Sequence, residues 1–326
     1  MTTRRKLLVA LGGVLAAPLA SFAQQKPAKV ARIGVLGQVS ASAYASEVEA
    51  LRAGLRDLGY VEGKNIVIEY RWAEGKPARL PELAAELVGL KVDVLVTHGA
   101  PGSLAAKRAT TSVPIVMYAG DAIAYGIVAS LARPGGNVTG SSTFNPEISA
   151  KRLELIKEAF PRTNRVAVLM KSSTPANGPL FQAMETTARS LKLELQKFEV
   201  RAPDEFDSAF LAMAKGRVDA LALPLDSLFV ANAKTIADLA AKQRLPSFGF
   251  TEFAEAGGLM ANGVSLLEMW RRHAYFVDKI LKGAKPADLP VEQPTKFELV
   301  INMKTAKALG IKFPQSILVR ADRVIE

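Results

Sequence analysis

The chain has 326 residues, of which 49% are hydrophobic and 22% are charged, and it contains no cysteine. This composition excludes a disordered or fibrous protein, and the lack of cysteine excludes disulfides, cysteine nucleophiles, thiolate metal sites and a lipid-bearing cysteine. The length is too great for one ordinary compact core and favours two lobes of roughly 100–150 residues each.

The first 23 residues have the pattern of a signal peptide. Three cationic residues at positions 4–6 precede an apolar run from Leu7 to Leu19, and Ser21-Phe22-Ala23 places small residues where a signal peptidase cleaves. We therefore expect cleavage after Ala23 and a soluble protein in the periplasm. The Arg4-Arg5 pair also fits a twin-arginine signal, and the sequence leaves the choice between that route and the general secretory route open.

The formal net charge is +11, and it falls to +8 when the three cationic residues of the leader are removed. The remaining Lys and Arg residues are scattered beside Glu and Asp, without a dense basic stripe interleaved with aromatic residues. A nucleic-acid partner is therefore not expected.

Predicted strands and helices alternate through the first half of the mature chain. The first predicted helix, for example, has apolar Val48, Leu51 and Leu55 at helical spacing. Such alternation predicts a parallel, doubly wound α/β sheet with right-handed crossovers. We expect its strands at residues 30–36, 65–70, 92–96 and 113–118.

The segment from Ala119 to Phe144 leaves this first lobe. Asp121 comes just after a buried strand, at the edge of the sheet where ligands collect in open α/β proteins. A short helix is predicted over Ile123–Leu131, and Arg133-Pro134-Gly135-Gly136 ends it. The small-residue stretch Asn137–Ser142 that follows is interpreted as a hinge.

The same order of elements recurs beyond this hinge and predicts a second lobe of the same kind. Two further links are expected at Gly258–Gly263 and Lys285–Thr295, with a helix over Leu266–Leu281 between them. Three connections between two lobes favour hinged motion. The predicted first lobe comprises residues 30–142 and 264–290, and the second comprises residues 143–263 and 291–326. Helices of the second lobe are expected at 147–159, 180–191, 205–215 and 231–242, and strands at 165–170, 193–199, 220–223, 247–250 and 297–301.

No catalytic template is present in the sequence. It contains no G-x-S-x-G elbow, no H-E-x-x-H pair, no phosphate-binding loop and no G-x-G-x-x-G that opens a helix, so neither a cofactor nor a metal is predicted. His98 follows a strand, where a ligand contact and an ordinary surface or hydrogen-bonded position fit equally well. His273, next to Arg271 and Arg272, is expected on the surface of its helix.

Loops of polar or small residues follow most of the predicted strands, and in a two-lobed protein these sheet edges face each other across a cleft. Asp121 and Asp226 are placed to meet a ligand ammonium, although each also fits the N-cap of the helix after it. Tyr44 and Tyr118 suit the wall of an apolar or aromatic site, whereas Phe229 and Phe250 are expected in the core. Polar side chains and backbone N–H groups at helix starts suit a carboxylate. The candidate ligand-binding residues are Gln38, Ser40, Tyr44, Gly99, Ala100, Pro101, Asp121, Ser172, Asn177, Asp226 and Thr251.

Four stretches of the chain carry motifs that resemble those of a known family. They are residues 58–66 (LGYVEGKNI), 130–140 (SLARPGGNVTG), 255–259 (EAGGL) and 282–290 (KGAKPADLP). The chain resembles the ABC-transporter substrate-binding proteins related to bacterial tryptophan and tyrosine receptors, over nearly its whole mature length. The resemblance implies a type I periplasmic binding fold, which closes over a small molecule and delivers it to an inner-membrane permease.

The resemblance also implies roles for single residues. Gln38 matches a glutamine that follows the first strand in the family, and Ala100-Pro101 matches a Thr-Pro or Ala-Pro loop. Asp121 matches an Asp-Pro pair, although Ala122 stands here in place of the proline. Asn177 lies in the Ser-rich loop, and Asp226 lies in the Pro-x-Asp segment.

We therefore expect the periplasmic, monomeric receptor of an ABC uptake transporter. Its expected ligand is an aromatic or other amino acid, or a small aromatic carboxylate, bound between the lobes. Two alternatives remain open. One is a ligand-sensing receptor subunit, and the other is an enzyme that uses Asp121 and Asp226 as an acid–base pair.

Overall fold

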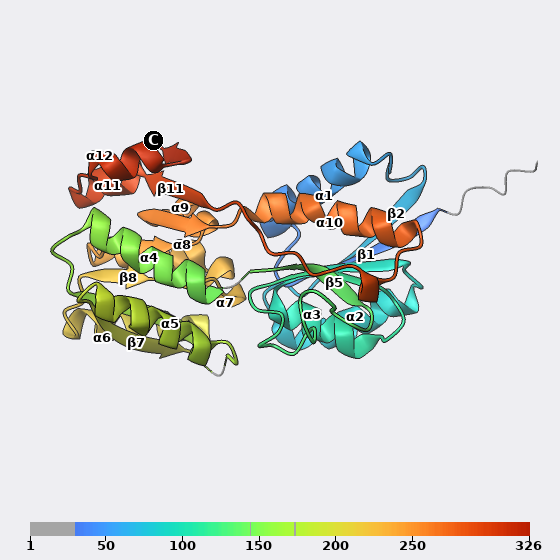
Figure 1. Ribbon diagram of the computed structural model, residues 1–326, viewed down its shortest axis with the longest axis horizontal. Helices are drawn as coiled ribbons and strands as arrows, with labels where there is room; N and C mark the ends of the chain where they lie inside the picture. The colour runs from blue at the N-terminus through green and yellow to red at the C-terminus, as the bar shows by residue number, and fades with distance from the viewer. Residues whose placement is uncertain (1–29, 144, 173) are drawn as a thin grey trace, which may run out of the picture.

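The computed structural model describes residues 30–143, 145–172 and 174–326, so the predicted leader, residues 1–23, lies outside the described part. The chain forms two α/β lobes side by side, each built around its own sheet (Figure 1). Strands before residue 143 form the sheet of the first lobe, and strands after it form the sheet of the second. The predicted fold class is confirmed.

Within the described residues, the sheet of the first lobe has five parallel strands. They are β1 (Ala31–Gly37), β2 (Ile66–Trp72), β3 (Val94–His98), β4 (Ile115–Ala119) and β5 (Val138–Ser142), in the order β2-β1-β3-β4-β5. Strands β3 and β4 are buried along their whole length, as the mainly apolar sequences VLVTH and IVMYA require. The helices are α1 (Ala45–Asp57), α2 (Leu80–Gly89) and α3 (Gly99–Ala109), with single 3-10 turns η1 (Ser42–Tyr44) and η2 (Pro77–Arg79).

Helix α10 (Leu266–Leu281) comes from late in the chain but lies alongside α1 on the first lobe (Figure 1). Its bounds are those predicted from the sequence. Trp270, Phe276 and Val277 on its buried face pack in one cluster with Leu51 and Leu55 of α1. This large apolar face explains why α10 packs on the first lobe, although most strands of the second lobe precede it in the sequence.

In the part of the chain that the structure describes, the sheet of the second lobe has seven strands in the order β12-β11-β10-β9-β8-β6-β7. The first five in the chain, β7-β6-β8-β9-β10 in space, repeat the order of the first lobe. Among the strands of the described ranges, β11 is the one that pairs antiparallel, with β10, because the chain re-enters this sheet from the first lobe. The strands are β6 (Arg165–Lys171), β7 (Glu194–Val200), β8 (Ala220–Ala222), β9 (Ser247–Gly249), β10 (Met260–Gly263), β11 (Glu298–Asn302) and β12 (Arg323–Ile325).

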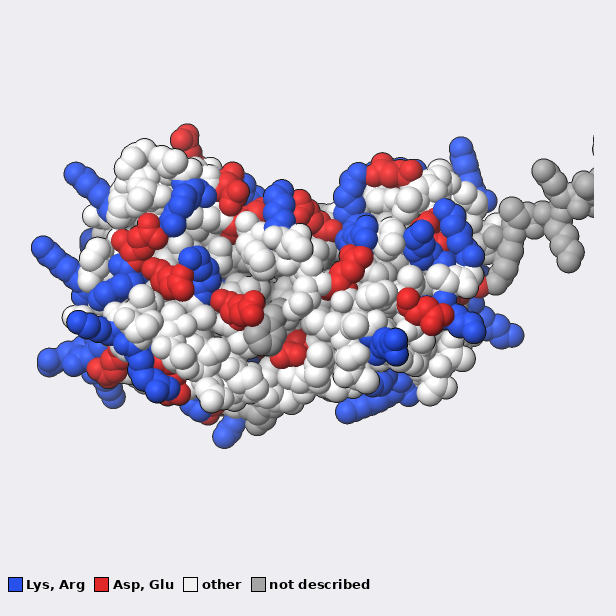
Figure 2. Space-filling view, in the orientation of Figure 1, with Lys and Arg blue, Asp and Glu red and all other residues white. Residues whose placement is uncertain are grey.

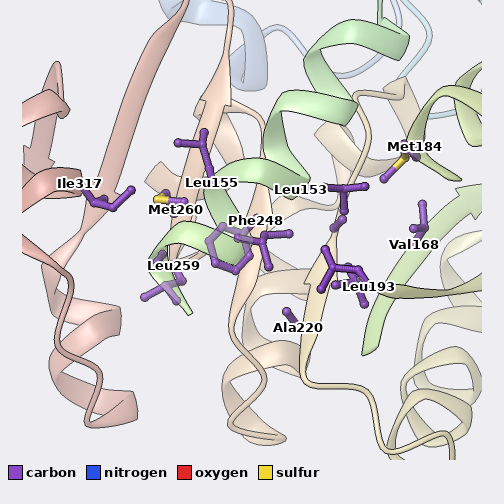
Figure 3. Packing of buried hydrophobic residues seen from close by; sticks show 14 of the residues in the cluster. Leu153, Leu155, Val168, Met184, Leu193, Ala220, Phe248, Leu259, Met260 and Ile317 are labelled. Carbon is purple, nitrogen blue, oxygen red and sulfur yellow. The ribbon is translucent and has the colours of Figure 1, made fainter. Parts of the chain in front are cut away.

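Eight α-helices cover the described part of the second sheet and its edges. On one face, Leu153 and Leu155 of α4 pack toward Phe248 and Met260 of the central strands, and Ile317 closes the end of this core (Figure 3). The helices are α4 (Asn145–Ala159), α5 (Asn177–Ser190), α6 (Phe206–Lys215), α7 (Ser227–Ala231), α8 (Ala233–Lys242), α9 (Thr251–Glu255), α11 (Met303–Leu309) and α12 (Gln315–Arg320), with the 3-10 turn η3 (Pro203–Glu205). The 3-10 turn η4 (Pro286–Asp288) contacts β5 of the first lobe instead.

Two of the stretches interpreted as links are strands for part of their length. Val138–Ser142 is the edge strand β5, and Met260–Gly263 is β10 of the second sheet. The third stretch runs along the free edge of β5: the Glu292 amide donates to Gly140 O at 2.9 Å, and the Ser142 amide donates to Glu292 O at 2.9 Å. Two connections between the lobes therefore lie side by side and are hydrogen bonded to each other.

The helix predicted over Ile123–Leu131 is wrong, since these residues form a series of turns. Gly126 has a φ of +64°, in the left-handed region that ends a helical turn. The amide of Ile127 then donates back to Ala122 O at 2.8 Å, which closes the turn. The apolar spacing of this stretch serves packing against the first sheet, where Ile127 and Val128 are buried.

Charged side chains are dispersed over the face shown in Figure 2, where Lys and Arg alternate with Asp and Glu on both lobes. None of the helices in the described ranges is long and apolar enough to cross a membrane. Those ranges also contain no cluster of three His, Cys, Asp or Glu residues that could hold a metal ion.

Candidate ligand-binding site

Residues that follow β1, β3 and β4 in the first lobe and β8 in the second line one open cleft. The strand order reverses between β1 and β3 in the first sheet and between β6 and β8 in the second sheet. This reversal is where open α/β sheets bind ligands. The lining residues are Tyr44, His98, Gly99, Ala100, Pro101, Tyr118, Gly120, Tyr125, Leu225, Asp226, Ser227, Val230, Leu266 and Trp270.

Aromatic rings form the wall that the first lobe presents. The ring centroid of Tyr44 lies 4.3 Å from that of His98 and 5.9 Å from that of Trp270, and the His98 and Trp270 centroids are 5.5 Å apart. Tyr118 and Tyr125, which precede and follow Gly120 in the sequence, add two more rings to the lining of the cleft. Flat rings of this kind favour a flat apolar or aromatic partner.

A buried hydrogen-bond network holds the centre of this wall. Gln38 Nε2 donates to His98 O at 2.8 Å and lies 3.4 Å from His98 Nδ1, and Tyr44 Oη lies 3.2 Å from the same Nδ1. Burial lowers the pKa of His98 to about 3, and His273 acts in the same direction. The imidazole is therefore neutral near pH 7, where it both donates and accepts hydrogen bonds.

Gly99 makes the turn from β3 into α3. Its φ is +66°, in the region that L-residues with a side chain rarely adopt, and a Cβ at this position would collide with Gln38 Nε2. The glycine therefore lets the start of α3 approach the side chain that supports His98.

Asp226 supplies the charge of the second-lobe side, as the one Asp, Glu, Lys or Arg among the lining residues. Its Oδ1 accepts from the Leu228 amide at 2.8 Å and caps the short helix α7. Burial raises the pKa of Asp226, and the Lys171 charge and the Leu228 amide act in the opposite direction. Because burial disfavours the bare carboxylate, a cation in the cleft would stabilise its charged form.

Arg152 of α4 holds the loop that carries Asp226. It is 2% exposed, and its two terminal nitrogens donate to Leu223 O at 2.8 Å and to Asn262 O at 2.7 Å. These carbonyls follow β8 and lie in β10, so a single side chain ties together two strand ends. Burial lowers the pKa of Arg152 to about 9.

Of the eleven candidate residues, the structure brings five together as lining of the cleft: Tyr44, Gly99, Ala100, Pro101 and Asp226. Gln38 lies behind this lining and contacts it through His98. Asn177 lines a smaller cavity that shares Tyr125, Leu225 and Asp226 with the cleft, and its Nδ2 donates to Lys171 O at 2.7 Å.

The other four candidates have local roles outside the cleft lining. Ser40 is half-buried, and its hydroxyl accepts from the Ala43 amide at 3.3 Å. Asp121 Oδ1 accepts from the Ala124 amide at 2.9 Å within the turns that replace the predicted helix. The Ser172 amide donates to Val200 O at 2.9 Å, and Thr251 is buried at the start of α9.

The sequence interpretation was wrong about His273, which is fully buried beneath the wall rather than on the surface. Its ring centroid lies 5.6 Å from that of Trp270. Arg271 and Arg272 beside it suggested an exposed face, but helical spacing places His273 with Trp270 and Val277 instead. Phe229 and Phe250 lie in the core as expected.

Several lining residues were missed. Trp270 and Leu266 lie on a helix that the sequence presented only as core packing, and Tyr125 lay inside the wrongly predicted helix. One signal was available: Leu266 and Trp270 are spaced four apart directly after a predicted link, where the first turns of a helix face the region between the lobes.

Residues 32–325 match the family described as "ABC transporter substrate binding protein". The chain belongs to this family. Among its curated relatives is a "Tyrosine-binding protein" of Clostridioides difficile, 28% identical over 261 residues, which span 79% of this chain and 74% of the relative.

Solved structures agree with this family membership. A conserved domain protein from Vibrio cholerae is 30% identical with a TM-score of 0.84, over 91% of this chain and 100% of that one. An ABC domain from Streptococcus pneumonia, solved in complex with L-Trp, is also 30% identical with a TM-score of 0.84, over 90% of this chain and 99% of that one. The two lobes thus have the type I periplasmic binding fold, and the chain is the solute-binding component of an ABC transporter.

Proposed function

We propose that this substrate-binding protein captures an aromatic amino acid in the cleft between its lobes. One observation carries the proposal: a cleft walled by Tyr44, Tyr118, Tyr125 and Trp270 has Asp226 as its single charged lining residue. The rings suit an aromatic side chain, and the carboxylate suits an α-ammonium group.

The relatives support the same class of ligand. One relative is named for binding tyrosine, and one solved relative holds L-Trp.

The lobes are proposed to close over the ligand through the connections near residues 143, 264 and 291–297. Tyr125 of the first lobe and Asp226 of the second line the same cleft, so a ligand between them can contact both lobes. A ligand that contacts both sides favours the closed state by its differential affinity for it. Scattering should then show a smaller radius of gyration with ligand than without, and an unchanged radius would contradict closure.

The mature protein is proposed to begin near Gln24, to work in the periplasm as a monomer, and to pass its ligand to an inner-membrane permease. Mass spectrometry of the exported chain tests the first point. Replacement of Arg4 and Arg5 by Lys separates the export routes, since a twin-arginine signal loses export with this change.

A purely binding role is proposed, without catalysis. The alternative acid–base pair requires Asp121 in the cleft, whereas its carboxylate accepts from the Ala124 amide outside the lining. Incubation with amino acids followed by chromatography tests this point, and chemical conversion would contradict it. A permease or a sensor kinase encoded beside the gene would separate transport from ligand sensing.

A thermal-shift screen tests the ligand class. Binding to the native state alone stabilises the protein by about 2.7 kcal/mol at a hundredfold excess over the dissociation constant. We expect L-tryptophan, L-tyrosine or L-phenylalanine to raise the melting temperature, and L-leucine and glucose to leave it unchanged. A shift with the non-aromatic compounds alone would overturn the proposal.

A further inference from the structure

Two nitrogen atoms in the first-lobe wall lie buried without a hydrogen-bond partner: His98 Nε2 and Trp270 Nε1. Both residues line the cleft, and they are 5% and 0% exposed. Buried polar atoms are paired in the great majority of cases, so two unpaired ones on the same wall need an explanation. Their rings are neighbours, with centroids 5.5 Å apart.

The network behind His98 decides which of its ring nitrogens carries the proton. The Gln38 side-chain amide is oriented by its hydrogen bond to His98 O at 2.8 Å, so its nitrogen faces Nδ1 at 3.4 Å. An amide nitrogen only donates, and Tyr44 Oη at 3.2 Å is able to donate as well. Nδ1 is thereby the acceptor, and in the neutral ring the proton resides on Nε2.

We infer that His98 Nε2–H, with Trp270 Nε1–H beside it, is the part of the cleft that recognises a hydrogen-bond acceptor on the ligand, namely the carboxylate of an amino acid. This inference rests on the proposed function and deepens it. His98 becomes a specificity-determining residue, and Gln38 and Tyr44 become positioning residues that fix its tautomer.

A carboxylate is the acceptor that the surroundings favour. The eleven-residue helix α3 begins at Gly99, directly after His98, and the N-terminus of a helix stabilises negative charge. Neutral donors add no positive charge of their own, so the ligand must balance its carboxylate internally. An α-ammonium near Asp226 on the opposite side of the cleft provides that balance.

The tautomer is testable in the unmodified protein, because the chain has only two histidines. Nitrogen-15 NMR of protein labelled at histidine should show a protonated Nε2 and an unprotonated Nδ1 for His98, assigned by loss of the His273 signals in H273F. L-Tryptophan should shift the His98 Nε2 resonance without changing the tautomer. A proton on Nδ1, or an Nε2 that does not respond to a bound ligand, would overturn the inference.

Affinity for a matched ligand pair tests the recognition. L-Tryptophan and tryptamine differ by the carboxylate alone. In H98F, calorimetry should show an affinity for L-tryptophan at least tenfold weaker and an affinity for tryptamine within about threefold of wild type. H98Q, which keeps an N–H near the Nε2 position, should regain part of the loss, and D121N, whose carboxylate lies outside the cleft lining, should leave both affinities near wild type.

The outcomes separate the two proposals. Equal losses for L-tryptophan and tryptamine in a folded H98F protein would overturn the acceptor assignment while the proposed function stands. If H98F does not fold, H98Q and the NMR experiment still decide. A wild-type protein that binds neither compound nor any other aromatic amino acid would overturn the proposed function and the inference together.

Discussion

The two sides of the cleft are built by different means. The first-lobe side consists of rings that contact one another, Tyr44, His98 and Trp270, supported from behind by Gln38. The second-lobe side consists of one loop, Leu225–Ser227, which is held at its base by Arg152 and carries a single carboxylate. The packed rings of the first lobe therefore determine the shape of the cleft. One residue on a loop of the second lobe selects the charge of the ligand.

Trp270→Ala should have the largest effect and should act on the wall. The indole is fully buried between α10 and the first sheet, and loss of such a side chain costs about 3–5 kcal/mol of unfolding free energy. Chemical denaturation measures this loss. Trp72→Ala is the matched control, because Trp72 is only partly buried and its removal should cost clearly less. Equal losses of unfolding free energy in the two variants would contradict the view that the first-lobe rings form the more rigid side of the cleft.

Asp226→Asn should act on binding rather than on stability. Asparagine keeps the cap on α7, but loss of the charge removes a bond to a ligand ammonium worth about 1.5–3 kcal/mol, or roughly tenfold to a hundredfold in affinity. Calorimetry with L-tryptophan measures the effect. For indole-3-acetate, which lacks an ammonium, the same change should leave binding equal or tighter.

The control for this variant is Asp121→Asn, which changes a carboxylate outside the cleft lining and should leave affinity near wild type. If Asp226→Asn binds L-tryptophan with wild-type affinity, Asp226 is only a helix cap and the charge-selecting role of the second lobe is wrong.

Tyr44→Phe should have a moderate effect, since it keeps the ring of the wall and removes the hydroxyl beside His98 Nδ1. We expect a loss of about 0.5–1.5 kcal/mol in unfolding free energy and a several-fold loss of affinity. Tyr60→Phe is the control: it removes a hydroxyl that donates to Asp278 Oδ1 at 3.0 Å, and neither residue lines the cleft. Similar stability losses with weaker binding in Tyr44→Phe alone would support the network.

A pH effect is expected from Glu252 at the start of α9, and it should be the smallest because this residue remains partly exposed. Burial raises the pKa of Glu252 to about 8, and Glu255 and Glu47 act in the same direction while backbone amides oppose it. The folded state then holds a proton that the unfolded chain releases near pH 4.5, so stability falls as the pH rises from about 4.5 to about 8.

Glu252→Gln should flatten this part of the profile, as melting temperatures at pH 5 and pH 9 would show. The difference between the two pH values should be smaller in the variant than in wild type. A larger or unchanged difference would mean that other groups control the pH dependence.

The fold was accessible from the sequence because its signals are periodic and local. The helix Leu266–Leu281 was predicted with its observed bounds, and the buried strands are recognisable in the sequence as apolar runs. The error over Ile123–Leu131 has a local cause as well, since Gly126 adopts a left-handed conformation that apolar spacing does not report.

The site was accessible only in part, because lining a cleft depends on which way a side chain points after two lobes have assembled. Asp226 and Tyr44 follow strands and were found by that rule. Trp270 and Tyr125 were not, since one lies on a helix that crosses back to the first lobe and the other lies in turns that looked helical. Asp121 follows a strand yet caps its own turn, so the same rule also gave a residue outside the lining.

The most direct test of this account is a crystal structure of the protein with L-tryptophan. We predict an indole against the rings of Tyr44 and Trp270, an ammonium about 2.7–3.2 Å from the Asp226 carboxylate, and a carboxylate at the same range from His98 Nε2. A ligand bound in the reverse orientation, or outside the cleft between the lobes, would contradict it.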